Sequence, residues 1–381
     1  MPGRSRSPQV KADIVTQTSI AQTLPPGLEV VTLTEADIAA CVELVRSGFE
    51  EFQDRGPAIR AWFDARIVHN PWQAALPGLG VGIRDGHGLI GFRAMFAQPW
   101  WLSGQSVVVA FAAHTAVDPR FRGQGLGTQL IDASRAVAVV SGSTSAGVVT
   151  QKAYQRLRFE PIGGSDNGFF STRASYFGSL QRRLGPRMGK PLARLFDLRL
   201  CWRDRSLGAT AGHWLESMTR CDDEVDRLWV RCRTFQASCL ERSSRYLNWR
   251  IFERPTHPLC LSAMRDRAGS LRALAVWTTT SYAEGIESAV LRDLMWPADE
   301  DDTVRRLLKL LVAHWRSTGI TWVSLEVSSE PLAKLFRALG YTSLPSNGNR
   351  YWIHSNTPLA EPVRRQWFRS GLDGDYFDVQ P

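Results

Sequence analysis

An almost unbroken run of Val, Ala and Phe extends from Val107 to Val117. Such a run is typical of a strand that is buried on both faces of a sheet. Pro119 ends the run, and glycines follow at positions 123, 125 and 127. Apolar residues then recur at helical spacing from Thr128 to Val140. The pattern therefore predicts a buried strand, a glycine-rich loop and a helix in direct succession.

The pattern before this unit is that of antiparallel strands. Residues 28–33 alternate as a strand, and residues 34–37 open a helix with polar capping residues. Two further strands, 79–83 and 89–97, are joined by residues 84–88, which form a hairpin signal. Together these elements predict an α/β (α+β) fold with a mixed, mostly antiparallel sheet flanked by helices. They do not fit a doubly wound nucleotide-binding fold.

The far end of the chain repeats this order of elements. The strand of residues 289–295 and the helix of residues 304–315 mirror the first half, and a strand follows at 322–327. The loop between the first two has no glycine or arginine and carries four carboxylates, which we interpret as helix caps: Asp299, Glu300, Asp301 and Asp302. A chain of 381 residues also has the length of two domains. The sequence thus predicts two tandem copies of one fold.

Basic residues concentrate between the two predicted copies. The net charge is +9 at pH 7, and nine Lys or Arg lie between Arg173 and Arg205 against only Asp197 and Asp204. We interpret this segment as a solvated linker between domains, or as a helix whose cations face water; the alternative is a patch that attracts anionic substrates, nucleic acid or a membrane face. No RNA-binding or helix-turn-helix pattern accompanies it, so we expect no specific nucleic-acid partner.

These patterns give a predicted domain organisation. Residues 1–26 form a flexible tail, 27–172 the first domain, 173–208 the basic linker and 209–381 the second domain. We expect the strand pattern of residues 169–177 to close the first domain.

Two classes of protein are disfavoured by the composition. No run of about eighteen apolar residues occurs, so we expect no membrane span, and the first residues lack the apolar core of a secretory signal. We therefore expect a cytoplasmic protein. The six cysteines form no C-x-x-C pair and have no His at metal-ligand spacing. We expect reduced thiols and no metal.

The glycine-rich loop has the chemistry of an anion site. A helix start exposes unpaired N–H groups at the positive end of the helix dipole. Gly123, Gly125 and Gly127 put no Cβ between these groups and a ligand, and Arg122 adds a cation. An ordinary glycine-rich turn is the alternative. Neither the Gly-Lys-Ser/Thr of a Walker loop nor the Rossmann spacing of glycines is present.

The same residues resemble motif A of the GCN5-related N-acetyltransferases (GNAT), R/Q-x-x-G-x-G/A, with Arg122, Gly125 and Gly127 at the fixed positions. The family's Val-x-Pro lead-in matches residues 117–119. In that family the loop holds the pyrophosphate of acetyl-coenzyme A. The resemblance implies acetyl-CoA, or another acyl-CoA, as co-substrate. It implies nine binding residues: Ala116, Val117, Arg122, Gly123, Gln124, Gly125, Leu126, Gly127 and Thr128.

A second motif of the family follows the apolar segment of residues 146–150. Residues 152–159 resemble motif B, A-x-x-x-Y-x-x-L-G-F, with Tyr154 five residues before Phe159. By this resemblance Tyr154 is the general acid that protonates the departing thiolate of coenzyme A; a tyrosine packed at a domain edge is the alternative. Arg158 stands where the family has Gly, so we expect an unusual helix end. The second copy of the motif has Phe336 at the place of Tyr154.

Candidates for the acceptor side are less distinct. His114 is the only imidazole near the proposed thioester and could accept a proton from the attacking group. Strand alternation puts it on the face opposite Ala113 and Thr115, so a bulge would be needed to bring it into the cleft. By resemblance, the segment that caps the acceptor site contains four acids, which are otherwise the wet side of a helix: Glu50, Glu51, Asp54 and Asp64.

Two further segments leave alternatives open. Residues 246–250 resemble a segment in second domains of bacterial tandem acetyltransferase-like proteins, several of which occur with polysaccharide biosynthesis; its Trp suits sugar stacking or a core. The tail of residues 367–378, with Asp373 and Asp375, is a surface cap or an acceptor contact.

The resemblance covers most of residues 27–355 and implies a tandem GNAT-like protein with a degenerate second domain. We expect an acetyl-CoA-dependent N-acetyltransferase that acylates an amine, or a hydroxyl, of a sugar or other small metabolite. One alternative is aminoacyl transfer from tRNA by a tandem GNAT-like enzyme. The other is a non-catalytic module that binds coenzyme A.

Overall fold

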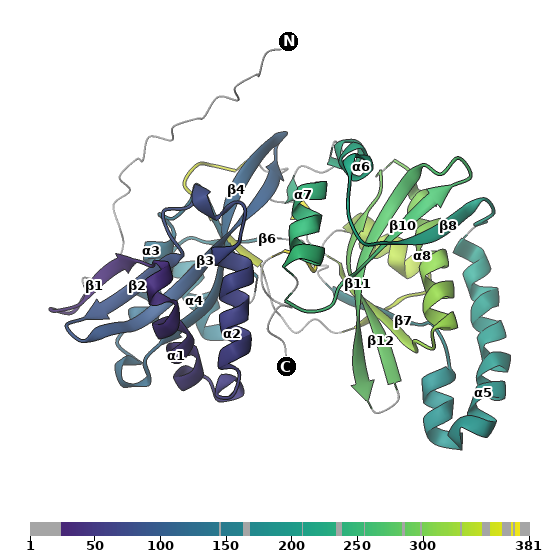
Figure 1. Ribbon diagram of the computed structural model, residues 1–381, viewed down its shortest axis with the longest axis horizontal. Helices are drawn as coiled ribbons and strands as arrows, with labels where there is room; N and C mark the ends of the chain where they lie inside the picture. Colours follow the sequence, from purple (N-terminus) through teal and green to yellow (C-terminus); the bar gives the residue numbers. More distant parts are fainter. Residues whose placement is uncertain are drawn as a thin grey trace, which may run out of the picture.

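Two mixed sheets flanked by helices make up the molecule (Figure 1). The computed structural model describes residues 24–373 except 145, 163–167, 208, 234–237, 255, 284–285, 298, 328–329, 345–350, 360–366 and 369. All but three of the strand pairs are antiparallel; the parallel ones are β4 with β5, β12 with β13, and β9 with β16. The predicted fold class is confirmed. The predicted tail, residues 1–26, lies outside the described residues except for its last three.

The first sheet has the order β1-β2-β3-β4-β5-β15-β6, with β9 beside β3 and β16 beside β9. Its strands are β1 (Glu29–Thr32), β2 (Gly80–Asp85), β3 (Gly88–Leu102), β4 (Gln105–Val117), β5 (Val140–Ser143), β6 (Glu160–Ile162), β9 (Ser238–Leu240), β15 (Tyr351–Ser355) and β16 (Trp367–Phe368). Its helices are α1 (Ile38–Gly48), α2 (Gly56–Phe63), α3 (Leu126–Ser134) and α4 (Val148–Arg156).

The second sheet has the order β14-β7-β13-β12-β11-β10-β8. Its strands are β7 (Gly168–Arg173), β8 (His213–Met218), β10 (Cys260–Asp266), β11 (Leu271–Ala283), β12 (Ile286–Met295), β13 (Trp322–Val327) and β14 (Thr342–Leu344). The helices of this half are α5 (Phe177–Arg203), α6 (Asp223–Arg233), α7 (Ser244–Leu247), α8 (Asp301–Ser317) and α9 (Glu330–Ala338).

Helices cover both faces of the first sheet. Buried residues of α1 and α2, such as Cys41 and Trp62, pack in one cluster with Phe111 and Ala113 of β4. Leu130 of α3 packs on the opposite face, in a cluster with Ala110 and Ala112. The run of Val, Ala and Phe in β4 is therefore buried on both sides, as its composition predicts.

The elements after the glycine loop differ from the prediction. The helix predicted to reach Val140 ends at Ser134, and Val140 begins β5. The apolar residues 148–150 form the first turn of α4. The sequence Val-Ser-Gly-Ser of β5 carries little apolar signal because small residues are required there: a Cβ on Gly142 would lie 2.8 Å from the ring of Phe111.

The two sheets exchange one strand each. Strand β7 pairs with β13 and β14 in the second sheet, and β15 pairs with β5 and β6 in the first. The expectation that residues 169–177 close the first unit is therefore wrong. An alternating pattern identifies a strand but not its partner, because any edge of similar polarity satisfies it. That residues 27–172 and 209–381 fold as separate units stays a prediction.

The basic segment is helical and does not run between the two sheets. Its main part is α5, which lies at the outer edge of the second half (Figure 1). Asp197 of this helix accepts hydrogen bonds from the hydroxyl of Ser175 and the N–H of Tyr176. The helix with exposed cations, one of the two forms expected for residues 173–208, agrees with α5, and the domain boundary at these residues stays a prediction.

The two halves share a continuous core. The ring of Trp72 in the first half contacts Tyr246 and Trp249, and the Trp249 indole N–H donates to the His69 carbonyl at 3.0 Å. Gln98 of β3 donates to the Tyr246 hydroxyl at 2.8 Å. Trp249 is 2% exposed. Of the two interpretations of residues 246–250, the core is therefore correct and sugar stacking by Trp249 is not.

The end of α4 has the geometry that glycine usually provides. Arg158 adopts φ 59°, and its counterpart in the second copy, Gly340, adopts φ 78°. In both copies the N–H after this residue donates to the carbonyl five residues back, from Phe159 to Tyr154 and from Tyr341 to Phe336. The expectation of an unusual helix end at Arg158 is wrong, since the backbone is the same.

We predict that Arg158→Gly raises the free energy of unfolding by about 1 kcal/mol, because a left-handed backbone is strained for arginine and not for glycine. Gly340→Ala should lower it by a similar amount, since a Cβ there meets nothing closer than 3.7 Å and only the backbone is strained. Urea denaturation of the two variants tests this. A change of the same sign in the free energy of unfolding of both variants would contradict the shared backbone geometry.

Candidate active site

The first sheet opens between β4 and β5. The two strands pair in parallel from Ala110 with Ser141 to Ala112 with Ser143, and the pairing stops there. Strand β4 continues to Val117 along β3 alone. Its last residues, including Ala116 and Val117, therefore have no strand partner on the β5 side. The parting leaves backbone groups of β4 at the edge of a gap in the sheet.

The glycine loop lies at the end of this parting strand. Gly123 and Gly125 adopt φ 81° and 79°, and Gly125 is the N-cap of α3. The N–H groups of Thr128 and Gln129 both donate to the Gly125 carbonyl. Within the described part of the chain, no backbone partner is found for the N–H groups of residues 123–127. The exposed loop thus presents free N–H groups at a helix start.

The side chain of Arg122 bonds the end of α1. Its guanidinium donates to the Gly48 carbonyl at 2.5 Å, at the end of α1, and to the Val117 carbonyl at 3.4 Å. A cation is favourable at a helix C-terminus. Arg122 therefore connects the loop to the end of α1.

The bulge that His114 requires is present. Arg93 pairs with Thr115 and Ala94 with Ala113, so His114 is the extra residue of β4, and it adopts φ 34°. The centroid of its ring lies 4.7 Å from that of the Trp62 ring of α2, and the two rings meet edge to face. His114 is partly exposed on the α1–α2 face. It also contacts Phe52, in the segment with Glu50 and Glu51, at 6.2 Å.

Tyr154 is fully buried and makes a polar contact that was not predicted from the sequence. Its hydroxyl accepts a hydrogen bond from Arg93 of β3 at 2.7 Å. The same guanidinium donates to the Thr115 hydroxyl at 3.0 Å and the Ser134 hydroxyl at 3.1 Å. Thr115 lies on the parting end of β4. Arg93 therefore joins Tyr154 to the gap between β4 and β5 and adds a buried positive charge beside its hydroxyl.

The second half contains the same gap and the same bulge. Strands β12 and β13 pair in parallel as far as Leu291 with Leu325. Val276 pairs with Asp293 and Trp277 with Leu291, so Arg292 is the extra residue. By this register Arg292 corresponds to His114, and Val276 to Arg93. Phe336 stands at the place of Tyr154. The second copy lacks both members of the Arg93–Tyr154 pair.

The C-terminal segment closes the second gap. The Gly371 N–H donates to the Arg292 carbonyl at 2.6 Å, one residue beyond the last paired position of β12. A Cβ on Gly371 would lie 3.0 Å from this carbonyl, so the two backbones are in close contact. Residues 370–373 are all buried, and Ser370 and Asp373 hydrogen-bond each other. Asp373 is thus part of a buried plug; Asp375 lies outside the described residues.

The predicted acids are ordinary surface and capping groups in this structure. Glu50, Glu51 and Asp54 are exposed, and Asp64 pairs with Arg60 at 3.1 Å. At the start of α8, Glu300 pairs with Arg231 at 2.7 Å and Arg272 at 2.9 Å. These arginines offset part of the negative charge of the second loop.

Metal and membrane features were searched over the described residues. No group of three His, Cys, Asp or Glu side chains there could hold a metal ion. No helix in those parts is long and apolar enough to cross a membrane. Four cysteine side chains are buried, and burial raises the pKa of each thiol to about 12: Cys41, Cys221, Cys232 and Cys239.

Known proteins share this architecture. Residues 39–156 match the model of the Acetyltransferase (GNAT) family. A GCN5-related N-acetyltransferase from Anabaena variabilis superposes with a TM-score of 0.58 at 16% identity over 86% of this chain and 72% of its own. Another from Kribbella flavida gives 0.52 at 16% identity over 86% and 71%. No curated protein matches the sequence.

A third structure matches across nearly its full length. The N-myristoyltransferase of Saccharomyces cerevisiae, with bound myristoyl-CoA, gives a TM-score of 0.53 at 10% identity over 93% of this chain and 91% of its own.

A parallel strand pair that separates at a bulge, followed by a loop and a helix, defines an acyl-CoA N-acyltransferase fold, and this chain contains it twice; only the first copy has glycines in the loop. The architecture is that of a tandem GNAT-like protein, and residues 39–156 of its first half match the GNAT family model.

The plug gives a prediction about pH. Asp373 is fully buried, and burial raises the pKa of its carboxyl to about 7, although Arg242 and the Ser370 N–H oppose the shift. An unfolded Asp has a pKa of about 3.9. The stability due to this group is therefore fully present below about pH 4 and is lost as the pH rises through 7.

We predict that the free energy of unfolding of the parent falls between about pH 5 and pH 8, because Asp373 ionises over this range. In Asp373→Asn, which cannot ionise, this fall should be smaller by about 2 to 4 kcal/mol. Urea denaturation at both pH values measures this, with the exposed Asp222→Asn as control. Equal pH dependence in Asp373→Asn and the parent would show that Asp373 does not ionise over this range.

Proposed function

We propose that the first half of the chain transfers an acetyl group from acetyl-CoA to an amine, or a hydroxyl, of a small acceptor such as a sugar. The observation that carries this proposal is the gap between β4 and β5 with a loop of unpaired N–H groups at its end. A pyrophosphate fits the loop, and an extended thioester arm fits beside an unpaired strand edge.

The donor would contact the nine residues predicted from motif A. Backbone N–H groups of residues 123–127 would bind the pyrophosphate, and those of Ala116 and Val117 would hold the thioester arm and its carbonyl. Oxyanion stabilisation by fixed N–H groups is a large term in acyl transfer. Arg122 would act indirectly, by fixing the loop to α1 through the Gly48 carbonyl.

The chemistry follows from the Arg93–Tyr154 pair. The acceptor nitrogen attacks the thioester carbonyl carbon and displaces the sulfur, which takes the phenolic proton of Tyr154. The phenolate that remains is stabilised by Arg93, whose guanidinium already donates to this oxygen at 2.7 Å. A proton from the acceptor nitrogen must leave on the other side of β4, where His114 faces the α1–α2 segment.

Two other activities stay as alternatives. Aminoacyl transfer from tRNA would use the same gap, and the basic charge of α5 favours it. A non-catalytic coenzyme A module would keep the loop without needing a buried arginine beside Tyr154. A myristoyl-CoA-binding neighbour also makes longer acyl donors worth assaying. Release of free thiol from acetyl-CoA with panels of amines and sugars separates these possibilities.

We predict that Tyr154→Phe lowers turnover by about one to four orders of magnitude while donor affinity barely changes. The matched control is Tyr246→Phe, because Tyr246 is equally buried and its hydroxyl also accepts one hydrogen bond, from Gln98 at 2.8 Å. Both variants lose a buried hydroxyl, so both should lose stability. Equal turnover in the two variants would remove Tyr154 from the mechanism.

We predict that Arg93→Met lowers turnover to a similar degree, and that Arg93→Met combined with Tyr154→Phe loses little more than either alone, because the two side chains act as a unit. An apolar residue is compatible with this place in the fold, since Val276 occupies it in the second copy. If the double variant instead loses the product of the two single-variant reductions in turnover, Arg93 acts independently of Tyr154. The pH dependence of turnover provides a second readout.

We predict that the chain binds one acetyl-CoA and that Gly127→Val binds none. Gly127 is the better test position, since Gly125 at φ 79° would be strained by any side chain, whereas Gly127 is helical and has open space around its Cβ position. Valine is also a better helix former than glycine, so the free energy of unfolding should not fall. Calorimetry and native mass spectrometry measure both quantities.

The second copy would stay empty for two reasons: its gap is closed by Gly371, and its loop carries acids in place of glycines. Two ligands per chain would contradict a closed second copy. One ligand surviving in Gly127→Val would mean that the loop is misassigned.

A further inference from the structure

Helix α5 is a helical hairpin with a narrow packed face. Gly185 leaves helical geometry at φ 75° and ψ 168°, and the chain restarts as a helix at Pro186. A Cβ on Gly189 would lie 2.6 Å from the Gln181 Cα, so the two arms are in close contact there. The buried positions of the long arm are Gly189, Ala193, Asp197 and Leu200, which share one face.

The opposite face of this arm is an exposed apolar stripe. Its members recur at spacings of three and four residues, which places them in one line along the helix: Met188, Pro191, Leu195, Leu198 and Trp202. Met188, Leu195, Leu198 and Trp202 are between 61% and 71% exposed. Of the thirteen exposed large apolar residues in the described part of the chain, six lie on α5. Such a concentration marks an interaction surface.

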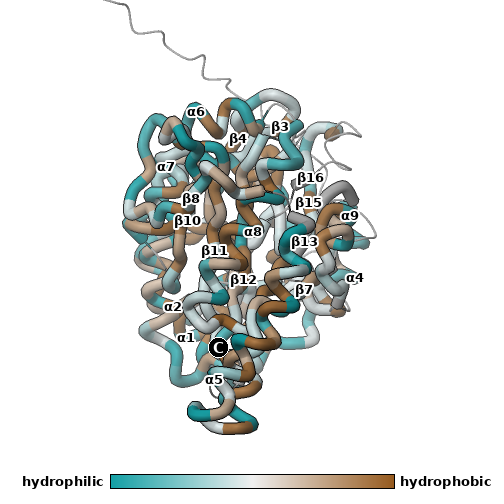
Figure 2. The backbone as a smooth tube through the Cα atoms, turned by 90° about the vertical axis from the view of Figure 1, so that its right-hand side faces the viewer, coloured by the Kyte–Doolittle hydropathy of each residue, from teal (hydrophilic) through white to brown (hydrophobic). Residues whose placement is uncertain are grey.

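The charges around this stripe have one sign. Exposed cations border it on both sides: Arg187, Lys190, Arg194, Arg199 and Arg205. The only two acids of the segment are buried; Asp197 bonds Ser175, and Asp204 bonds Arg203 at 2.7 Å. Arg205 lies over the Trp202 ring at 5.4 Å. Figure 2, which faces this side, shows α5 as a mixture of strongly apolar and strongly polar segments.

We propose that α5 docks the protein on an anionic membrane surface, with the apolar stripe in the headgroup region and the flanking cations on lipid phosphates. An apolar face bordered by Lys and Arg, with Trp at the boundary, is the pattern of helices that lie in a membrane interface. A second copy of the chain fits less well, because a symmetric pairing of two stripes would place arginines opposite arginines. Charge complementarity therefore favours an anionic surface.

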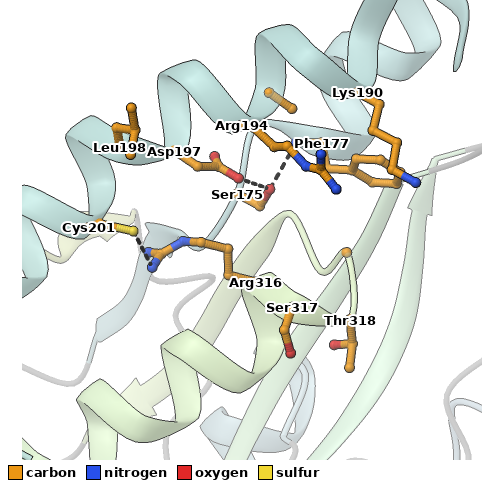
Figure 3. Close-up of a pocket in the computed structure, with 12 residues that line it drawn as sticks. Ser175, Phe177, Lys190, Arg194, Asp197, Leu198, Cys201, Arg316, Ser317 and Thr318 are labelled. Carbon is orange, nitrogen blue, oxygen red and sulfur yellow. Dashed lines mark hydrogen bonds between the residues drawn. The ribbon is translucent and has the colours of Figure 1, made fainter. Parts of the chain in front are cut away.

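A pocket beside the stripe offers a place for one headgroup. It has a volume of about 570 Å³ and lies between α5 and the end of α8. In Figure 3, Lys190 and Arg194 line it from α5, and Ser317 and Thr318 line it from the end of α8. Among the described residues, no ion pair is found for Lys190 or Arg194, so both cations are available to a phosphate.

The test is sedimentation of the full chain with vesicles of phosphatidylcholine alone or of equal parts phosphatidylcholine and phosphatidylglycerol. We expect binding to the anionic vesicles only, and weaker binding at high salt. Neutralising Arg187, Arg194 and Arg199 to Gln should weaken binding about five-fold for each arginine. Leu195→Ser together with Trp202→Ser should weaken it on the order of tenfold or more.

Matched controls lie elsewhere on the second half. Arg227→Gln and Val230→Ser remove an exposed cation and an exposed apolar side chain of α6 and should leave vesicle binding unchanged. Equal losses in the α6 and α5 variants, or no binding to anionic vesicles, would overturn the proposal. A chain that dimerises in solution, and becomes monomeric with Leu195→Ser, would mean that a second copy covers the stripe. Inhibition of vesicle binding by free inorganic phosphate alone would point to a soluble anion as occupant of the pocket.

Discussion

The parting of β4 from β5 is the constraint on which the rest of the first half depends. Both strands are buried, so unpaired backbone groups at their ends are costly unless a ligand or water satisfies them. The bulge at His114 turns the last residues of β4 away from the pairing direction, and the glycine loop continues from there into α3. A fold that maintains such a gap keeps a row of directed hydrogen-bonding groups for a thioester arm.

Both copies of the fold contain the gap in the sheet, but it is open in the first copy and closed in the second. In the first, a buried arginine and tyrosine border the gap, and the loop is open. In the second, Val276 and Phe336 replace the pair, and the chain's own Gly371 bonds the strand beyond the gap. Loss of both polar members together is physically consistent, since a buried arginine without its acceptors would be costly. The second copy contributes packing, through Trp249 and Tyr246, to the first.

The sequence was sufficient for the elements with strong local patterns and insufficient for their long-range partners. The strand, glycine loop and helix around Gly125 follow from period and turn chemistry, as does the hairpin at residues 84–88. The exchange of β7 and β15 could not be predicted, because the alternation of polar and apolar residues in a strand does not specify which strand it pairs with. Arg93 was missed for the same reason: in sequence it is one arginine in an apolar strand, and only the register places it beside Tyr154.

The most direct test of the central claim is a crystal structure of the chain with coenzyme A. The account predicts one ligand, its pyrophosphate on the N–H groups of residues 123–127 and its sulfur beside the Tyr154 hydroxyl, with the second gap still closed by residues 370–373. A ligand in the second half, or a sulfur on the opposite side of the sheet from the Arg93–Tyr154 pair, would contradict it.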